Sequence, residues 1–285
     1  VLERILSGIQ YILPQHALSH LVYRLMRSQK TWLKNLLIRS ISHVTGIDVD
    51  EALSPEPADY ASFNAWFTRE LKPGARHFDP DPDALLCPSD GRISETSSLN
   101  GGRILQAKGK DYSLQELLAN DAVCAQLDGG FFSTIYLSPR DYHRVHMPLR
   151  GHLQRMIHVP GRLFSVAPYT VRQVPGLFAR NERVVSIFAT ESGPMVVVLV
   201  GAMLVSSIQT VWAGEITPSE NDGSSVVNYR GENIALERGS EMGRFNMGST
   251  VIVLLPKGVV EPVPGLAAGD AVKVGERLAT LISPN

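Results

Sequence analysis

The sequence has little cysteine and almost no net charge. Its 285 residues include two cysteines, Cys87 and Cys124, and neither belongs to a CxxC pair or to another metal-ligand spacing. We therefore expect two free thiols in a reducing compartment, and no metal site. The formal net charge of −1 argues against a nucleic-acid-binding protein.

Long hydrophobic runs are also missing. No uninterrupted apolar run approaches the roughly 20 residues that span a bilayer. The first 20 residues, VLERILSGIQYILPQHALSH, contain too many polar positions for a signal peptide and lack a small-residue cleavage site. These absences predict a protein that faces the cytoplasm and is soluble or peripheral at a membrane.

The charge that is present is unevenly distributed. Residues 1–47, the N-terminal arm, carry six Lys or Arg against one acid, Glu3, which is net +5. Apolar residues in the arm follow the i, i+3, i+4 spacing of helices, with breaks at Pro14 and Gly46. Two interpretations fit this pattern: helices that lie on an anionic membrane surface, or a helical bundle packed on the protein's own body.

The character of the sequence changes near Leu85. Residues 61–76 suggest one more short helix, and prolines then mark a linker. After Leu85, apolar runs of four to eight residues alternate with Gly, Pro, Asn and Asp turns, which is typical of β-strands. The one clear helix in this half is SLQELLAN, with Ser113 as its expected N-cap.

These patterns predict an α+β chain with three parts. The parts are N-terminal amphipathic helices (1–47), a helical linker segment (48–84), and a mainly antiparallel β barrel or sandwich (85–285). The C-terminal stretch GLAAGDAVKVGERLATL resembles biotinyl and lipoyl carrier domains, which have the barrel-sandwich hybrid fold. Lys257 and Lys273 lack the hairpin context of a carrier lysine, so this resemblance concerns the fold alone.

Three short stretches carry side chains suited to chemistry. CPSDGRIS holds Asp90 in an Asp-Gly turn, YLSPRDYHRVHMPLRG contains His143 and His146, and MGRFNMGSTVIVLLP places Gly248 and Ser249 before an apolar strand. Histidine titrates near neutral pH and suits acid–base catalysis. Asp90, His146 and Ser249 could also form a nucleophilic triad. Because Ser249 lacks a G-x-S-x-G context, a serine hydrolase is the weaker alternative.

Several ordered blocks resemble one enzyme family. They are ILQAKGKDYSL, YLSPRDYHRVHMP, VPGRLFSV, LFARNERV, VWAGEITP and EMGRFNMGST. Together they look like the proenzymes of bacterial phosphatidylserine decarboxylases, from the N-terminal helices to about residue 256. The family's cleavage motif is Leu-Gly-Ser-Thr, and Met247 replaces its Leu here, which preserves volume and apolar character.

The resemblance implies a self-processing enzyme. Ser249 would attack the carbonyl of Gly248, the chain would be cut between them, and Ser249 would become a covalent pyruvoyl group derived from serine, the expected cofactor. His146 would be the base for self-cleavage, Asp90 would orient His146, and His143 would donate a proton during decarboxylation. The implied reaction converts phosphatidylserine to phosphatidylethanolamine and CO2 through a Schiff base with the pyruvoyl group.

A lipid substrate also favours the membrane interpretation of the arm. The residues expected to insert are Leu2, Ile5, Leu6, Ile9, Ile12 and Leu13. The implied partners are phosphatidylserine, an anionic surface at the cytoplasmic face of the cell membrane, the two cleavage products as an α/β heterodimer, and a homodimer of these. Two alternatives remain open: a pyruvoyl decarboxylase for another amine-bearing carboxylate, and a non-enzymatic binding module.

Overall fold

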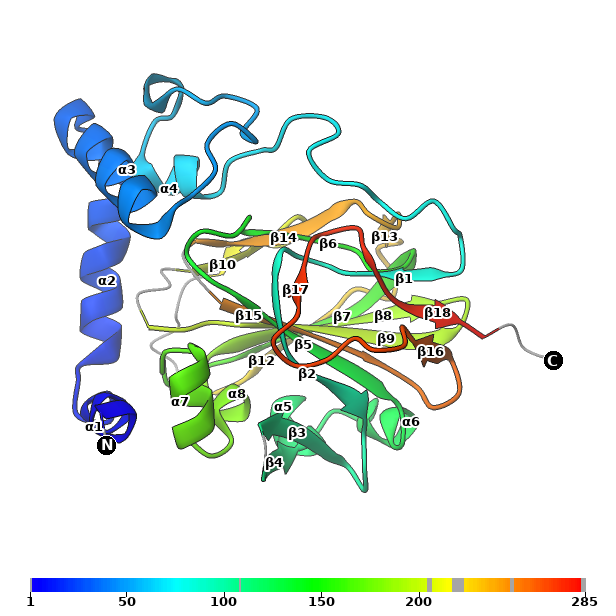
Figure 1. Ribbon diagram of the computed structural model, residues 1–285. Coiled ribbons are helices and arrows are strands. Elements are labelled where there is room, and N and C mark those ends of the chain that lie inside the picture. The colour runs from blue at the N-terminus through cyan, green and yellow to red at the C-terminus, as the bar shows by residue number, and fades with distance from the viewer. Residues whose placement is uncertain (1, 108, 204–206, 217–222, 247–248, 283–285) are drawn as a thin grey trace.

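The computed structural model describes residues 2–107, 109–203, 207–216, 223–246 and 249–282 (Figure 1). A large antiparallel sheet forms the centre. A smaller sheet covers one of its faces, short helices cover the other, and the helices of the N-terminal arm stand along one side of this body (Figure 1). The expected α+β class and mainly antiparallel pairing are therefore confirmed.

The central sheet has nine strands. Its order is β12-β7-β8-β9-β15-β5-β2-β17, with β13 also paired to β7. The strands are β2 (Gly91–Ser98), β5 (Phe131–Leu137), β7 (Gly151–Val159), β8 (Arg183–Thr190), β9 (Gly193–Val200), β12 (Ser225–Asn228), β13 (Ala235–Leu236), β15 (Ser249–Leu255) and β17 (Ala271–Val272). Apolar stretches that the sequence analysis assigned to strands form β5, β8, β9 and β15.

Three smaller sheets complete the β-structure. A four-stranded sheet has the order β11-β10-β14-β6, a three-stranded sheet the order β1-β18-β16, and β3 pairs with β4. Their bounds are β1 (Ala84–Leu86), β3 (Arg103–Ala107), β4 (Lys110–Ser113), β6 (Arg144–His146), β10 (Ser207–Thr210), β11 (Gly214–Ile216), β14 (Glu241–Asn246), β16 (Val260–Pro262) and β18 (Arg277–Leu281). No sheet closes on itself within the described ranges, so the expected barrel is not confirmed.

The unbroken apolar run of β15 reflects burial on both faces. Val251 and Val253 pack in the core between the large sheet and the four-stranded sheet, together with Phe245 of β14. Ile252 and Leu254 point the opposite way, into a second core under the short helices. These helices are α5 (Leu114–Leu117), α6 (Cys124–Leu127), α7 (Pro168–Gln173) and α8 (Leu177–Arg180). The Ser113 hydroxyl caps α5, as expected.

The N-terminal arm and the linker contain the remaining helices. They are α1 (Leu2–Ile9), α2 (Gln15–Met26), α3 (Thr31–Thr45), the 3-10 turn η1 (Pro57–Asp59) and α4 (Phe63–Phe67). Gly46 ends α3 with a left-handed φ of 68°, as its position predicted. The helix expected within residues 61–76 stops early at Phe67, because Leu71 forms a β-bridge with Ala52.

Polar side chains attach the arm to the body. Ser7 is 3% exposed, and Gln10 and Gln15 are equally inaccessible. Gln10 Oε1 accepts a hydrogen bond of 2.8 Å from the Ser165 amide, and Gln15 Oε1 accepts one of 2.9 Å from the Leu163 amide. An amphipathic helix packed on a core would bury its apolar face. The buried face of α1 is polar instead.

The apolar face of α1 is consequently exposed to solvent. Leu2 is 70% exposed and Ile12, just after the helix, is 83% exposed; Ile5, Leu6 and Ile9 are also exposed. The interpretation of α1 as part of a bundle packed on the body through its apolar face is therefore wrong. No helix in the described ranges has both the length and the hydropathy needed to cross a bilayer.

The far end of the arm is packed differently. Met26 of α2 and Ile38 of α3 are buried against the aromatic residues of α4, which are Phe63, Trp66 and Phe67. The arm thus has an apolar contact with the linker at one end and a polar contact with the body at the other.

Candidate active site

The expected cleavage point lies between two strands of different sheets. β14 ends at Asn246 and β15 begins at Ser249. Gly248, the expected acyl donor, lies outside the described residues, and so does Met247. We call the segment between Asn246 and Ser249 the junction. Its two flanking residues are both buried, so the junction is anchored inside the protein on each side.

Ser249 is fully buried. Its hydroxyl has no hydrogen-bond partner among the described residues, and the same holds for the Thr250 hydroxyl. A buried polar atom without a partner costs about 1–3 kcal/mol. Such atoms are rare in folded proteins and often mark functional positions. Buried hydroxyls such as those of Ser133, Thr134 and Ser186 share this state, so what distinguishes Ser249 is its burial at the expected cleavage point.

One short segment holds both sides of the junction. β5 pairs with β15, so that Leu137 lies opposite Ser249, and β6 pairs with β14. The loop of residues 138–143 joins β5 to β6, and the Phe245 amide donates to the His143 carbonyl at 3.0 Å. His143 is thereby brought to the junction by backbone pairing alone.

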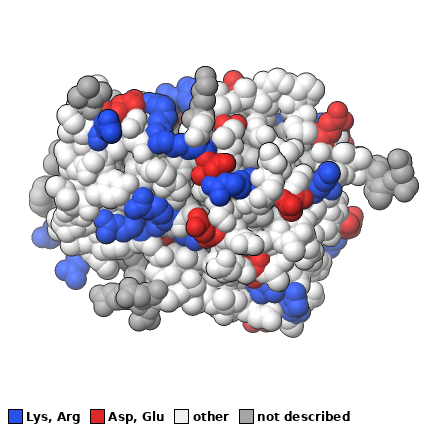
Figure 2. All heavy atoms as spheres, turned by 90° about the horizontal axis from the view of Figure 1, so that it is seen from below, with Lys and Arg blue, Asp and Glu red and all other residues white. Residues whose placement is uncertain are grey.

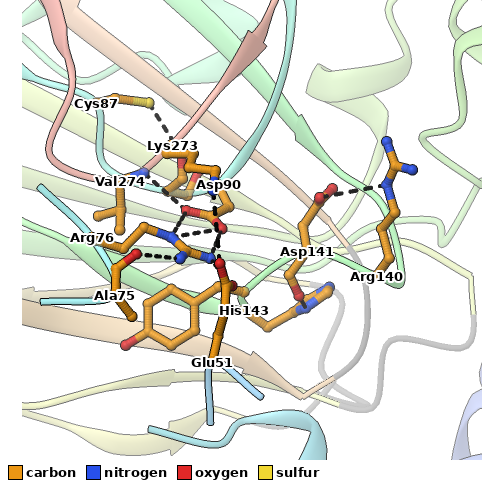
Figure 3. Close-up of polar contacts among 12 residues, drawn as sticks. Glu51, Ala75, Arg76, Cys87, Asp90, Arg140, Asp141, His143, Lys273 and Val274 are labelled. Atoms are coloured by element: carbon orange, nitrogen blue, oxygen red, sulfur yellow. Dashed lines mark hydrogen bonds and ion pairs between the residues drawn. The ribbon is translucent and has the colours of Figure 1, made fainter. Parts of the chain in front are cut away.

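The ring of His143 is buried and neutral. Its Nδ1 lies 2.7 Å from the Asp141 main-chain carbonyl, so Nδ1 carries the proton, and Nε2 has no partner in the described part of the chain (Figure 3). The Phe67 ring stacks on it with 4.1 Å between centroids. Burial lowers the pKa of His143 to about 3, and the Arg69 cation adds to this effect. For His143 to act as a proton donor, its surroundings must therefore change so that the ring becomes protonated.

The ring of His146 is fixed at both nitrogens. Nδ1 lies 2.8 Å from the Gly239 carbonyl oxygen and therefore carries the proton. Nε2 lies 3.2 Å from the Tyr142 hydroxyl, which must then be the donor. Burial lowers the pKa of His146, although the Gly239 carbonyl opposes this shift. His146 is thus a neutral imidazole whose basic nitrogen is covered by Tyr142.

Asp90 is bound to an arginine rather than to histidine. Arg76 Nε lies 2.9 and 3.0 Å from the two Asp90 carboxylate oxygens, and the Val274 amide donates to Oδ1 at 2.9 Å (Figure 3). No hydrogen bond joins Asp90 to His146 within the described ranges. The guanidinium fork matches a carboxylate better than an imidazole does. Asp90 still acts on His146 through space, because its charge raises the pKa of that ring.

The Asp-Gly turn has a steric reason. Gly91 has a φ of +154°, and a Cβ at this position would lie 2.3 Å from the Tyr136 carbonyl oxygen. Only glycine tolerates so close an approach. Gly91 thus allows β2 to pair closely with β5, and this pairing sets the position of the preceding residue, Asp90.

The linker segment forms one wall of the site. A cleft of about 280 Å³ opens beside His146. It is lined by Glu70, Leu71, Lys72, Pro73, Gly74, Arg76, Phe78, Tyr142, Arg144, His146, Glu241 and Val274. Arg76 also pairs with Glu51 at 2.7 Å, which ties the linker to Asp90. The linker is therefore part of the site as well as a connection to the arm.

Sequence reasoning missed four of these groups. Arg76, Tyr142 and the carbonyls of Asp141 and Gly239 contact the predicted residues directly. Tyr142 directly precedes His143 in DYHRVH, so its place beside the candidate histidines was a usable signal. The carbonyls have no sequence signal at all. No cluster of three His, Cys, Asp or Glu suited to a metal ion occurs among the residues described.

Comparison with known families gives a consistent result along the chain. A family model described as phosphatidylserine decarboxylase matches residues 63–280, and a second model, described as PSD, matches residues 7–43. The first match includes Asp90, His143, His146 and Ser249. The second covers most of the N-terminal arm.

Individual relatives are similar over nearly their whole length. A phosphatidylserine decarboxylase proenzyme of Xanthomonas axonopodis pv. citri (strain 306) is 51% identical over 275 residues, 96% of this chain and 98% of the relative. That of Alkalilimnicola ehrlichii is 52% identical over 276 residues, 96% and 95% of the two chains. That of Methylococcus capsulatus is 49% identical over 278 residues, 97% and 96%. The chain belongs to the phosphatidylserine decarboxylase family.

Proposed function

We propose that this protein cleaves itself at Gly248-Ser249 and decarboxylates phosphatidylserine to phosphatidylethanolamine. The observation that carries the proposal is the buried hydroxyl of Ser249, which has no partner among the described residues. Ser249 lies where β15 pairs with β5, and the 138–143 loop connects β5 to β6 and so brings in His143 and His146. Family membership supports the substrate, because the relatives are named for it.

The self-cleavage step uses groups of the chain and one water molecule. Ser249 Oγ attacks the Gly248 carbonyl carbon, and the acyl group moves from nitrogen to oxygen to give an ester. Removal of the Ser249 α-proton then expels the Gly248 carboxylate. The dehydroalanine left at residue 249 hydrolyses to a pyruvoyl group and ammonia. A weak hydroxyl nucleophile needs a base, and neutral His146 can accept its proton once Tyr142 releases Nε2.

The surroundings of Ser249 fit a ketone at the new chain end. When formed, a pyruvoyl group accepts the electrons that remain when CO2 leaves, as pyridoxal phosphate does. β15 is paired on both sides, with β5 and β9, over most of its length. These pairings support retention of residues 249–285 after the cut, as an α/β heterodimer with residues 1–248.

His143 would supply the proton that replaces CO2. Its Nε2 has no partner among the described residues and is the atom of this ring that can exchange a proton. In the structure its pKa is about 3, so it must first gain a proton. An anionic substrate in the site would raise this pKa, because a nearby negative charge favours the imidazolium.

The arm would hold the enzyme at the cytoplasmic face of the cell membrane. The exposed apolar residues of α1 support this role. Arg4, Arg24, Lys30 and Arg39 are exposed, whereas Lys34 is buried and donates to the Tyr60 carbonyl. In Figure 2 the side where the arm lies is largely uncharged, and the charged residues on it are mostly Lys and Arg. Each basic residue near an anionic surface contributes about 1 kcal/mol.

Membrane binding can be tested without removing the arm. Replacing Leu2, Ile5, Leu6, Ile9 and Ile12 with Ser is expected to weaken flotation with phosphatidylglycerol vesicles more than about 100-fold, because each buried aliphatic side chain contributes about 1.5–3 kcal/mol. Deleting the arm is less informative, since Met26 and Ile38 belong to a buried core. The matched control replaces exposed Val226 and Val227 of β12 with Ser. Unchanged flotation of the arm variant would contradict the proposal.

The function itself is tested by mass and turnover. We expect the purified protein to consist of residues 1–248 and of residues 249–285 with a ketone in place of the Ser249 amine, and to release CO2 from phosphatidylserine vesicles. Free serine tested in parallel separates a lipid-specific enzyme from a decarboxylase of another amine-bearing carboxylate. An intact chain without carbonyl reactivity would refute the proposal. Sedimentation would show whether the processed protomers form the homodimer that we also propose.

A further inference from the structure

Asn246, the last residue of β14, is held at both ends of its side chain. Its Oδ1 accepts a hydrogen bond of 3.0 Å from Asn64 Nδ2 of α4. Its Nδ2 donates to Ser207 Oγ at 2.6 Å and to Glu215 Oε1 at 3.5 Å. Asn246 is 1% exposed, so these partners replace water entirely. An amide that uses both its donor and its acceptor is fixed in orientation.

The contacts of Asn246 continue to the N-terminal arm. Glu215 of β11 accepts from Ser207 Oγ and forms an ion pair with Arg27, at the end of α2. We call Arg27, Glu215, Ser207, Asn246 and Asn64 the junction network. The network joins the arm, the linker and the four-stranded sheet at one residue, two positions before Gly248.

Asn246 and Ser249 are the last fixed points on either side of the junction. Asn246 pairs with Ser207 at the end of the β10–β14 ladder, and Ser249 pairs with Leu137 at the start of the β5–β15 ladder. The two ladders belong to different sheets. The described ends of β14 and β15 are therefore held by separate sets of contacts.

We propose that Asn246 is a positioning residue for self-cleavage: its amide, held by the junction network, fixes the end of β14 on the side of the junction opposite Ser249. This inference rests on the proposed self-cleavage. Backbone pairing alone leaves the end of a strand free to fray, whereas two side-chain hydrogen bonds of opposite polarity fix it. A misplacement of about 1 Å between reacting groups can slow a reaction about 100-fold.

The test places a negative charge where the Asn246 amide nitrogen lies. In Asn246→Asp, one carboxylate oxygen can still accept from Asn64, but the other faces Glu215. Two carboxylates in one site repel, and one of them titrates at a raised pKa. We expect self-cleavage of the newly synthesised precursor, followed on a gel after translation in vitro, to be about 10- to 100-fold slower at pH 8.

The pH dependence distinguishes positioning from a general loss of structure. The ratio of wild-type to Asn246→Asp cleavage rates should decrease between pH 8 and pH 6, as the added carboxylate becomes protonated. Adding Glu215→Gln to Asn246→Asp removes the repulsion and should restore cleavage at every pH to at least the rate of Arg27→Gln, because Glu215→Gln also removes the ion pair with Arg27. Thermal unfolding of both precursors, measured with Ser249→Ala to prevent cleavage, controls for stability.

A second comparison tests the connection to the arm. Arg27→Gln removes the ion pair with Glu215 and should slow self-cleavage about threefold or more, in the absence of any membrane. Arg230→Gln removes the same charge from an exposed position outside the network and outside the arm, and should leave the rate unchanged.

The outcomes separate this inference from the proposed function. If the wild type cleaves and Asn246→Asp cleaves equally fast at all pH values, Asn246 does not position the junction. A slow Asn246→Asp variant that is neither pH-dependent nor restored by Glu215→Gln would reduce Asn246 to a packing residue. If the wild-type chain itself never cleaves, the proposed function fails instead.

Discussion

A precursor that carries His146→Asn is expected to remain a single 31.2 kDa chain, whereas the wild type separates into two. Asparagine can place its Nδ2 where the histidine has Nδ1, so the hydrogen bond to the Gly239 carbonyl is preserved. The substitution removes only the basic Nε2. Loss of a general base typically slows a step 10²- to 10⁴-fold, and a denaturing gel measures it directly.

The control for this experiment is a second buried histidine. His158 lies outside the site and bonds to Glu182 through Nε2 at 2.8 Å. His158→Gln keeps a nitrogen at that position and should cleave normally. Cleavage of His146→Asn at the wild-type rate would exclude His146 as the base.

The pH profile gives an independent check on His146. Only the neutral imidazole can accept the Ser249 proton, and burial lowers the pKa of His146 below the usual 6.5. Wild-type self-cleavage should therefore be nearly constant from pH 8 down to pH 6.5 and decline only at lower pH. A decline that begins above pH 7 would mean that a different group titrates.

The variant His143→Asn is expected to cleave itself but to decarboxylate 10²- to 10⁴-fold more slowly. Asn can again replace Nδ1 as the donor to the Asp141 carbonyl, so the 138–143 loop keeps its conformation. The variant lacks Nε2, the atom that would deliver the proton. Carbonyl reactivity of the smaller chain would show that processing is complete, and CO2 release from phosphatidylserine would show the defect.

His143→Phe serves as the companion variant. It preserves the stacking on Phe67 but removes both nitrogens. If Nε2 supplies the proton, both variants should complete self-cleavage but decarboxylate phosphatidylserine slowly. Full turnover by either one would make His143 a structural residue of the loop.

Strand positions were predictable because they depend on local pattern. The run from Val251 to Leu255 is apolar at every position since both faces of β15 are buried. Closure of the sheet was not predictable, because it depends on whether the two edge strands, β12 and β17, form hydrogen bonds with each other. Local alternation of residues is the same in a closed barrel and in stacked open sheets.

The sequence proposes candidate members of the site but does not reveal their contacts. Sequence identified Asp90, His143, His146 and Ser249, yet the orienting group on His146 is a carbonyl, which any residue could provide. The partner of Asp90 is Arg76, from a segment that the sequence marked only as a linker. Side-chain type limits which chemistry is possible, whereas tertiary packing decides which groups meet.

The central position of β15 has a consequence for how the protein survives denaturation. Before the cut, unfolding and refolding concern one chain, and their equilibrium is independent of concentration. After the cut, the piece that begins at residue 249 would leave the sheet on unfolding, so refolding would require two molecules to meet. Heating would then inactivate the mature protein irreversibly at low concentration while the precursor still recovers. Self-cleavage at this position would therefore replace a concentration-independent folding equilibrium with one that depends on the concentration of both pieces.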